Sequence, residues 1–196
     1  MLHIVDDEEV VRDALLWLAS SRQIAARTYP DASHFLAALA KDFVYAKEGD
    51  CLLLDVRMPG ISGTALFDYL TAQQLQQRLP VIFLTGHGDV PMAVDTLKRG
   101  AFDFFEKPFN DNKLMDRVLQ AQSSSCVAHA KALVFQRLDT LSQREREVLD
   151  LILAGKLNKV IADKLDISMR TVEVHRANIF DKMKVHSAVE LAGLLK

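Results

Sequence analysis

The sequence has little cysteine. Its 196 residues include two cysteines, Cys51 and Cys126, and no Cys-x-x-Cys pair. Neither a disulfide framework nor a zinc site is therefore expected. Cys51 opens an apolar run, and we interpret it as a small buried hydrophobic residue without chemistry of its own.

Long hydrophobic runs are also absent. No apolar stretch approaches the roughly 20 residues that a membrane-spanning helix needs. The first residues lack the basic and apolar segments of a secretory signal. We therefore expect no membrane anchor and a cytoplasmic location. An intrinsically disordered chain is excluded as well, because 49% of the residues are hydrophobic and the net charge is only -2.

The charge is unevenly distributed along the chain. Residues 1–120 carry 12 basic and 17 acidic side chains, whereas residues 141–196 carry 10 basic and 8 acidic ones. The length permits a medium domain joined to a small one. An acidic first part and a mildly basic second part are compatible with a sensor domain joined to a nucleic-acid-binding domain.

Residues 1–122 alternate apolar runs typical of strands with amphipathic patterns typical of helices. The expected strands cover residues 2–5, 24–29, 51–56, 81–84 and 103–106. The expected helices cover residues 8–20, a segment around 35–39, a segment from 63, and residues 91–99 and 110–122. Five successive β–α units predict an α/β fold with a doubly wound, five-stranded parallel sheet. Right-handed crossovers would place helices on both faces of this sheet.

Strands disappear after residue 122. Three serines at 123–125 are expected to interrupt the pattern, and apolar residues then recur at helical spacing, so we predict a helical linker over residues 123–140. Residues 141–196 predict an all-α domain of four short helices. Ser142 and Glu145 have the spacing of a capping box.

Within this second part, the pattern predicts a helix over 158–165, a tight turn, and a helix over 169–183 capped by Ser168. A helix, a short turn and a second helix form the arrangement that places a recognition helix in the major groove of DNA.

Polar residues stand at the carboxyl ends of four predicted strands: Asp6 and Asp7, Asp55, Thr85, and Lys107. In an open parallel sheet these ends meet at one edge, where ligands bind. Each residue alone has a simpler explanation, such as acidic residues at a helix N-terminus or ordinary turn residues. Together they predict one site.

The chemistry of this set is coherent. Crowded carboxylates require a cation, and Mg²⁺ prefers oxygen ligands. A carboxylate beside Mg²⁺ can attack a phosphoryl group and form an aspartyl-phosphate. Lys107 and the metal would offset charge on the phosphoryl oxygens, and the Thr85 hydroxyl would donate a hydrogen bond to them.

Asp6-Asp7, the run Asp55-Val-Arg-Met-Pro-Gly60, Thr85 and Lys107-Pro108 resemble the receiver domain of two-component response regulators. The resemblance covers roughly residues 1–120 and implies a receiver domain over residues 1–122 with a flavodoxin-like, CheY-like sheet. It implies that Asp55 is the phosphoacceptor, with a sensor histidine kinase as the donor. It also implies that Mg²⁺ is held by Asp6, Asp7, Asp55 and the backbone carbonyl of Arg57.

The same resemblance assigns further roles. Lys107 and Thr85 assist phosphoryl transfer, Thr85 and Phe104 are the switch residues, and the peptide bond before Pro108 is cis. Side chains at the positions of Arg57 and His87 tune the lifetime of the phosphoryl group in such domains, although His87 is equally well explained as an exposed loop residue.

The segments 141–149, 158–159 and 170–176 resemble a LuxR-type helix-turn-helix, and the whole chain resembles a response regulator of the FixJ/NarL type. Val160 and Leu157 depart from the usual pattern of this domain. The last helix, 187–195, mediates dimer contacts in the family, or serves ordinary core packing. Basic and outward-facing residues predict the DNA contacts, which are Lys159, Arg170, Thr171, Glu173, Val174, Arg176, Ala177, Asn178 and Lys182.

The sequence therefore predicts a transcription factor switched by phosphorylation of Asp55, with no catalysis beyond its own phosphorylation and dephosphorylation. Phosphorylation would favour a homodimer, formed through the fourth helix and fifth strand, that binds promoter DNA. Two alternatives remain. One is a constitutive DNA-binding protein with a purely structural receiver. The other is an aspartyl-phosphate phosphotransferase, which typically has a second Asp where Arg57 stands.

Overall fold

The computed structural model describes residues 1–41, 43–86 and 90–195. His87 lies outside the described residues. The chain divides into two compact units, Met1–His129 and Ala130–Lys196. Helix α5, Asp111–Asp139, contributes residues to both units. None of the described helices combines the length and the apolar character needed to cross a bilayer.

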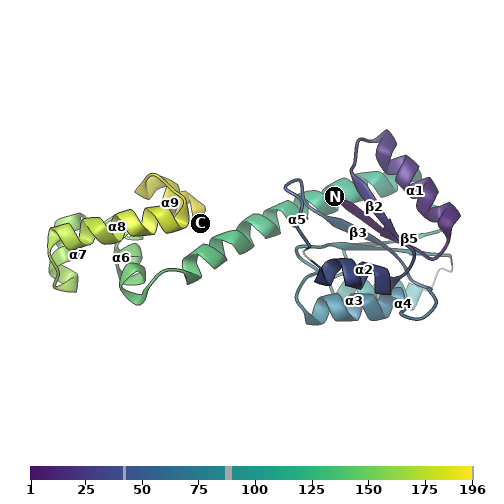
Figure 1. The fold of residues 1–196 in the computed structure, drawn as a ribbon, viewed down its shortest axis with the longest axis horizontal. Coiled ribbons are helices and arrows are strands. Elements are labelled where there is room, and N and C mark those ends of the chain that lie inside the picture. The colour runs from purple at the N-terminus through teal and green to yellow at the C-terminus, as the bar shows by residue number, and fades with distance from the viewer. Residues whose placement is uncertain (42, 87–89, 196) are drawn as a thin grey trace. The chain divides into compact units, whose positions relative to one another are not determined.

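A five-stranded parallel sheet forms the centre of the first unit (Figure 1). Its strands are β1 Leu2–Val5, β2 Ala26–Tyr29, β3 Cys51–Asp55, β4 Val81–Thr85 and β5 Asp103–Glu106. The spatial order is β2-β1-β3-β4-β5, and every neighbouring pair is parallel. The predicted doubly wound sheet is confirmed. Strand β2 begins two residues later than predicted, because the N–H of Ile24 donates to the carbonyl of Ala19 at the end of the preceding helix.

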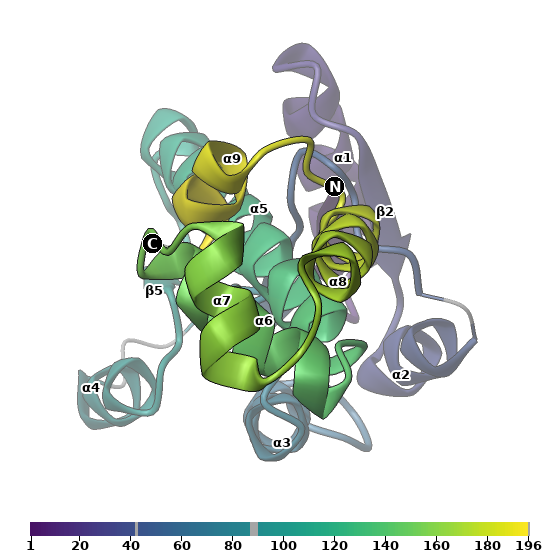
Figure 2. The same cartoon turned by 90° about the vertical axis from the view of Figure 1, so that its left-hand side faces the viewer.

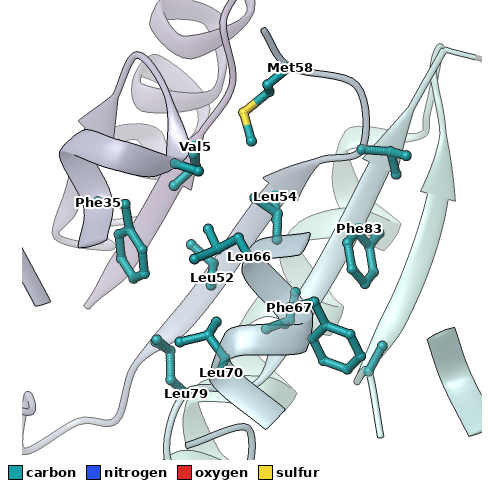
Figure 3. Packing of buried hydrophobic residues seen from close by; sticks show 14 residues of the cluster. Val5, Phe35, Leu52, Leu54, Met58, Leu66, Phe67, Leu70, Leu79 and Phe83 are labelled. Carbon is teal, nitrogen blue, oxygen red and sulfur yellow. The ribbon is translucent and has the colours of Figure 1, made fainter. Parts of the chain in front are cut away.

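Helices cover both faces of the sheet: α1 Glu9–Ser21 and α5 on one face, and α2 Ala32–Ala40, α3 Gly63–Ala72 and α4 Val90–Lys98 on the other (Figure 1). Successive residues of a strand point to opposite faces. Accordingly, Leu52 and Leu54 of β3 pack in the core shown in Figure 3, whereas Cys51 and Leu53 pack in the second core, against α1 and α5. Burial on both faces explains why β3 and β4 are continuously apolar.

The expected interruption at serines 123–125 is wrong, because α5 runs through all three. Ser125 is buried, and its hydroxyl accepts from the N–H of Asp50 at 2.9 Å and donates to the carbonyl of Arg78 at 2.5 Å. A serine whose hydroxyl is bonded to other segments does not compete for the hydrogen bonds of its own helix.

The loop before β3 lies very close to this part of α5. Gly49 has φ +88, and a Cβ built on it would lie 1.9 Å from the carbonyl oxygen of Gln122. A side chain is therefore excluded at Gly49 by both its φ and the available space. Further along α5, the ring of His129 stacks on Tyr45 and its Nδ1 lies 3.1 Å from the Arg78 guanidinium.

The second unit contains the last part of α5 and four short helices (Figure 2). These are α6 Gln143–Leu153, α7 Asn158–Leu165, α8 Met169–Met183 and α9 Ala188–Leu194. The capping box of Ser142 and Glu145 is present, and Ser168 caps α8 by accepting from the N–H of Thr171. Val172, Ile179 and Met183 are buried and form the inner face of α8.

Candidate functional site

The predicted polar residues lie together at one edge of the sheet. Asp6 follows β1, Asp55 ends β3, Thr85 ends β4 and Lys107 follows β5, and these four strands are neighbours in the sheet. Parallel pairing brings their carboxyl ends to the same edge. The register confirms this, because Asp55 pairs with Leu84, and Thr85 pairs with Glu106 beside Lys107.

Lys107 joins the two buried carboxylates of the site. Its Nζ lies 2.7 Å from Oδ2 of Asp6 and 2.8 Å from Oδ1 of Asp55. A third carboxylate, that of Glu8, has its Oε1 at 3.9 Å. Asp6 is fully buried and Asp55 is 6% exposed. Charge-assisted bonds of this kind are among the stronger hydrogen bonds in proteins. The peptide bond between Lys107 and Pro108 is cis.

Backbone N–H groups hold the remaining oxygen of each carboxylate. The N–H of Glu8 donates to Oδ1 of Asp6 at 2.9 Å, and the N–H of Arg57 donates to Oδ2 of Asp55 at 2.7 Å. Each carboxylate is thus fixed at both oxygens. A carboxylate has about four lone-pair positions, so each of the two still has acceptor capacity for a further ligand.

The pKa values of Asp55 and of Lys107 are both raised, for different reasons. Burial raises the pKa of Asp55, and the neighbouring charge of Asp6 acts in the same direction, whereas the bonds from Lys107 and from the N–H of Arg57 act against it. Burial alone would lower the pKa of Lys107, but its bonds to Asp55 and Asp6 and their negative charges more than offset this and raise it. Lys107 is therefore a permanent cation at neutral pH.

The donor set fits a hard divalent cation. Among the described residues, no three acidic, histidine or cysteine side chains converge closely enough to form a metal site by themselves. Mg²⁺ does not require this, because it typically takes one or two carboxylates and keeps several water molecules. Asp6 and Asp55 supply two adjacent carboxylates, and Asp7 and Arg57, both exposed, flank them in the chain.

The predicted switch residues Thr85 and Phe104 lie on the neighbouring strands β4 and β5. Thr85 is 2% exposed at the end of β4. Phe104 is half-buried in β5 and packs against the core that lies between the sheet and the helices α2, α3 and α4. Its ring lies 6.4 Å from that of Phe83. Thr85 is thus at the carboxyl end of β4, and Phe104 lies in the adjacent edge strand.

The predicted DNA-contact residues fall into two groups. Six of them are exposed on α7 and α8: Lys159, Arg170, Glu173, Val174, Ala177 and Asn178. The other three are half-buried and have partners inside the unit: Thr171, Arg176 and Lys182. The Lys182 ammonium lies 2.7 Å from Oε2 of Glu145 and 3.1 Å from the carbonyl of Thr140. The structure thus gives Lys182 a role within the fold.

Sequence reasoning missed one residue beside the carboxylates. Arg12 of α1 donates from Nη1 to the carbonyl oxygens of Asp6 at 2.8 Å and Asp7 at 3.0 Å. Its position six residues after Asp6 was the available signal, since the first turns of a helix that follows a strand lie near the end of that strand.

Comparisons with known proteins agree with this arrangement. Residues 2–119 match the response regulator receiver domain, and residues 139–195 match the bacterial regulatory proteins of the luxR family. The C4-dicarboxylate transport transcriptional regulatory protein DctR of Rhodobacter capsulatus is 49% identical, over 98% of both chains. The transcriptional regulatory protein FixJ of Rhizobium meliloti is 44% identical, over 98% of this chain and 93% of its own.

Solved structures give the same picture. The response regulator StyR is 37% identical with a TM-score of 0.71, covering 99% of this chain and 96% of its own. Full-length FixJ from B. japonicum is 40% identical with a TM-score of 0.57, covering 98% of this chain and 94% of its own. The family predicted from the motifs is confirmed. The chain belongs to the FixJ-type response regulators, which are transcriptional regulators that join a receiver domain to a LuxR-type helix-turn-helix.

Proposed function

We propose that Asp55 accepts a phosphoryl group from a sensor histidine kinase in a Mg²⁺-dependent reaction, and that this switches DNA binding. The observation that carries the proposal is the position of Asp55, which is buried at the end of β3 with its carboxylate fixed by Lys107 and by the N–H of Arg57. A nucleophile held in one orientation avoids much of the entropic cost of reaching the reactive geometry.

In the proposed reaction, a carboxylate oxygen of Asp55 forms a bond to phosphorus. The bond between phosphorus and the histidine nitrogen of the kinase breaks, and its electron pair stays on that nitrogen. Lys107 offsets negative charge on the phosphoryl oxygens, and the hydroxyl of Thr85 donates to one of them. Asp6, Asp7, Asp55 and the Arg57 carbonyl would hold Mg²⁺, which supplies further neutralisation of that charge.

We further propose which part of the chain carries each function. Residues 1–122 form the receiver, 123–140 the linker, and 141–196 the DNA-binding domain, all in the cytoplasm. The exposed residues of α7 and α8 contact double-stranded promoter DNA, with Lys159 and Arg170 binding phosphates. Phosphorylation moves Thr85 and Phe104 and favours a homodimer through the α4 and β5 surface.

The decisive experiment measures the intact mass of the full chain after incubation with a small phosphodonor, with and without Mg²⁺. We expect a single phosphoryl adduct that requires Mg²⁺ and is absent from Asp55→Asn. Asp95→Asn is the matched control, because Asp95 is an exposed aspartate of α4, and it should be modified like the wild type. An adduct that persists in Asp55→Asn would refute Asp55 as the acceptor. The absence of any adduct in the wild type would favour a receiver that acts without phosphate.

A further inference from the structure

Arg12 holds the loop that carries the two acidic residues after β1. A single guanidinium nitrogen bonds two successive carbonyl oxygens, those of Asp6 and Asp7. The side chain is half-buried in the first turns of α1. One residue therefore fixes two neighbouring peptide units beside the carboxylate pair.

The two acidic residues depend on Arg12 to different degrees. Asp6 is also held by its backbone N–H, which donates to the carbonyl of Tyr29 at 3.3 Å, and by the bonds from Glu8 and Lys107 to its carboxylate. The carboxylate of Asp7 makes no hydrogen bond or ion pair with the part of the chain that the structure describes. The backbone position from which the Asp7 side chain extends is therefore held by Arg12, whereas the carboxylate itself is free to turn toward a ligand.

The charge of Arg12 works against this role. A guanidinium beside a cation site repels the cation, and in the partly buried surroundings of Asp6 the repulsion is screened less than in water. On charge alone, removal of Arg12 would tighten the binding of a divalent cation. A positioning role predicts the opposite sign, so the two explanations are separable by experiment.

We propose that Arg12 is a positioning residue for the divalent cation: by holding the carbonyls of Asp6 and Asp7, it fixes the backbone from which Asp7 can turn its exposed carboxylate toward a cation bound at Asp6 and Asp55. This inference rests on the proposed function, because it concerns the same Mg²⁺ site. Groups that orient metal ligands without touching the metal typically contribute roughly 10–100-fold in affinity.

The test measures Mn²⁺ binding to the unphosphorylated full chain. The amount of free Mn²⁺ is read from its electron paramagnetic resonance signal. We expect Arg12→Met to weaken binding roughly 10-fold. Arg12→Lys keeps the charge but has a shorter reach and a different donor geometry, so it should also weaken binding. The matched control is Arg22→Met. Arg22 follows the same helix and bonds Asn112, so this change removes one positive charge without touching the loop.

Unchanged or tighter Mn²⁺ binding by both Arg12 variants would overturn the proposal. If Arg12→Met does not fold, as judged by circular dichroism, the result for Arg12→Lys decides alone.

A second readout is the Mg²⁺ concentration that gives half-maximal phosphorylation by a small phosphodonor. We expect this concentration to rise while the rate at saturating Mg²⁺ stays close to that of wild type. Wild-type protein that binds no Mn²⁺ would instead refute the metal site of the proposed function itself, and this inference with it.

Discussion

At the scale of single residues, the buried carboxylate of Asp55 is held in place for the proposed reaction, but its negative charge lowers the free energy of unfolding. Burial, reinforced by the charge of Asp6, raises its pKa above the usual value of 3.8. A carboxyl group with a raised pKa favours the folded state while it is protonated, and this contribution is lost as the pH rises through the folded-state pKa. At neutral pH the ionised Asp55 therefore lowers the free energy of unfolding of the first unit.

We expect Asp55→Asn to raise the melting temperature of the first unit at pH 7, because it removes the buried charge. The gain should shrink as the pH falls through the raised pKa of Asp55, since the wild type then becomes neutral as well. Scanning calorimetry at pH 7 and at successively lower pH measures both effects. The exposed control Asp95→Asn should change the free energy of unfolding by less than about 1 kcal/mol. An equal effect of Asp55→Asn at every pH would contradict the explanation.

At the scale of secondary-structure elements, Glu145 joins α6 to α8. Oε2 of Glu145 accepts from the N–H of Ser142 at 2.8 Å and from Lys182 at 2.7 Å, and the residue is 4% exposed. The bond from Lys182 lowers the pKa of Glu145, burial opposes this, and the bonds from Ser142 add to the lowering. A lowered pKa stabilises the fold at pH values above about 4.5, and this stability is lost as the pH falls through the folded-state pKa.

We expect Lys182→Met to destabilise the second unit by about 1–3 kcal/mol, because it removes a partner of a buried carboxylate. Lys184→Met is the matched control, since Lys184 pairs with Asp181 at an exposed position and should contribute less than about 1 kcal/mol. Hydrogen exchange of the backbone amides in α6 and α8 at pH 7 reports both values. Equal protection in the two variants would show that the Glu145 pair contributes nothing specific.

Features that follow from local sequence rules, or from the general geometry of parallel sheets, were predictable, and features that depend on particular distant side chains were not. The apolar run of β3, the capping box at Ser142 and the turn before Ser168 all follow from local rules. The continuity of α5 at Ser125 depends on Asp50 and Arg78, which lie 75 and 47 residues away. The carboxylate site was predictable because strand ends converge in any parallel sheet. The role of Lys182 depends on side-chain contacts that no spacing rule specifies, whereas the position of Arg12 near the end of β1 gave a weak signal and its two bonds did not.

At the scale of the whole molecule, the proposed dimer makes a prediction about salt. Each protomer presents Lys159 and Arg170 at exposed positions, so a dimer places two such sets on DNA. The logarithm of DNA affinity falls with the logarithm of salt concentration by about 0.9 for each phosphate contact. We expect phosphorylated protein to sediment as a dimer and to have about twice the salt slope of the unphosphorylated protein on mixed-sequence duplex DNA.

The variant Arg170→Ala should reduce the slope of the phosphorylated dimer by about 1.8, which is one contact from each protomer. In the monomer the reduction should be about half as large. Fluorescence anisotropy at several salt concentrations measures the slopes. Identical slopes before and after phosphorylation, together with an unchanged sedimentation coefficient, would exclude the dimer mechanism.

The contacts of Gln122 and Ser125 in α5 with the loops at Gly49 and Arg78 also have a consequence for folding during translation. The first unit completes its second core only when Leu114, Met115 and Val118 of α5 are available, and Ser125 follows them. Synthesis proceeds at about 5–20 residues per second, so the ribosome spends several seconds on residues 130–196. The first unit can thus form around the first half of α5 while the last helices are still being translated, and a nascent chain arrested near the end of α8 should already protect these contacts from protease.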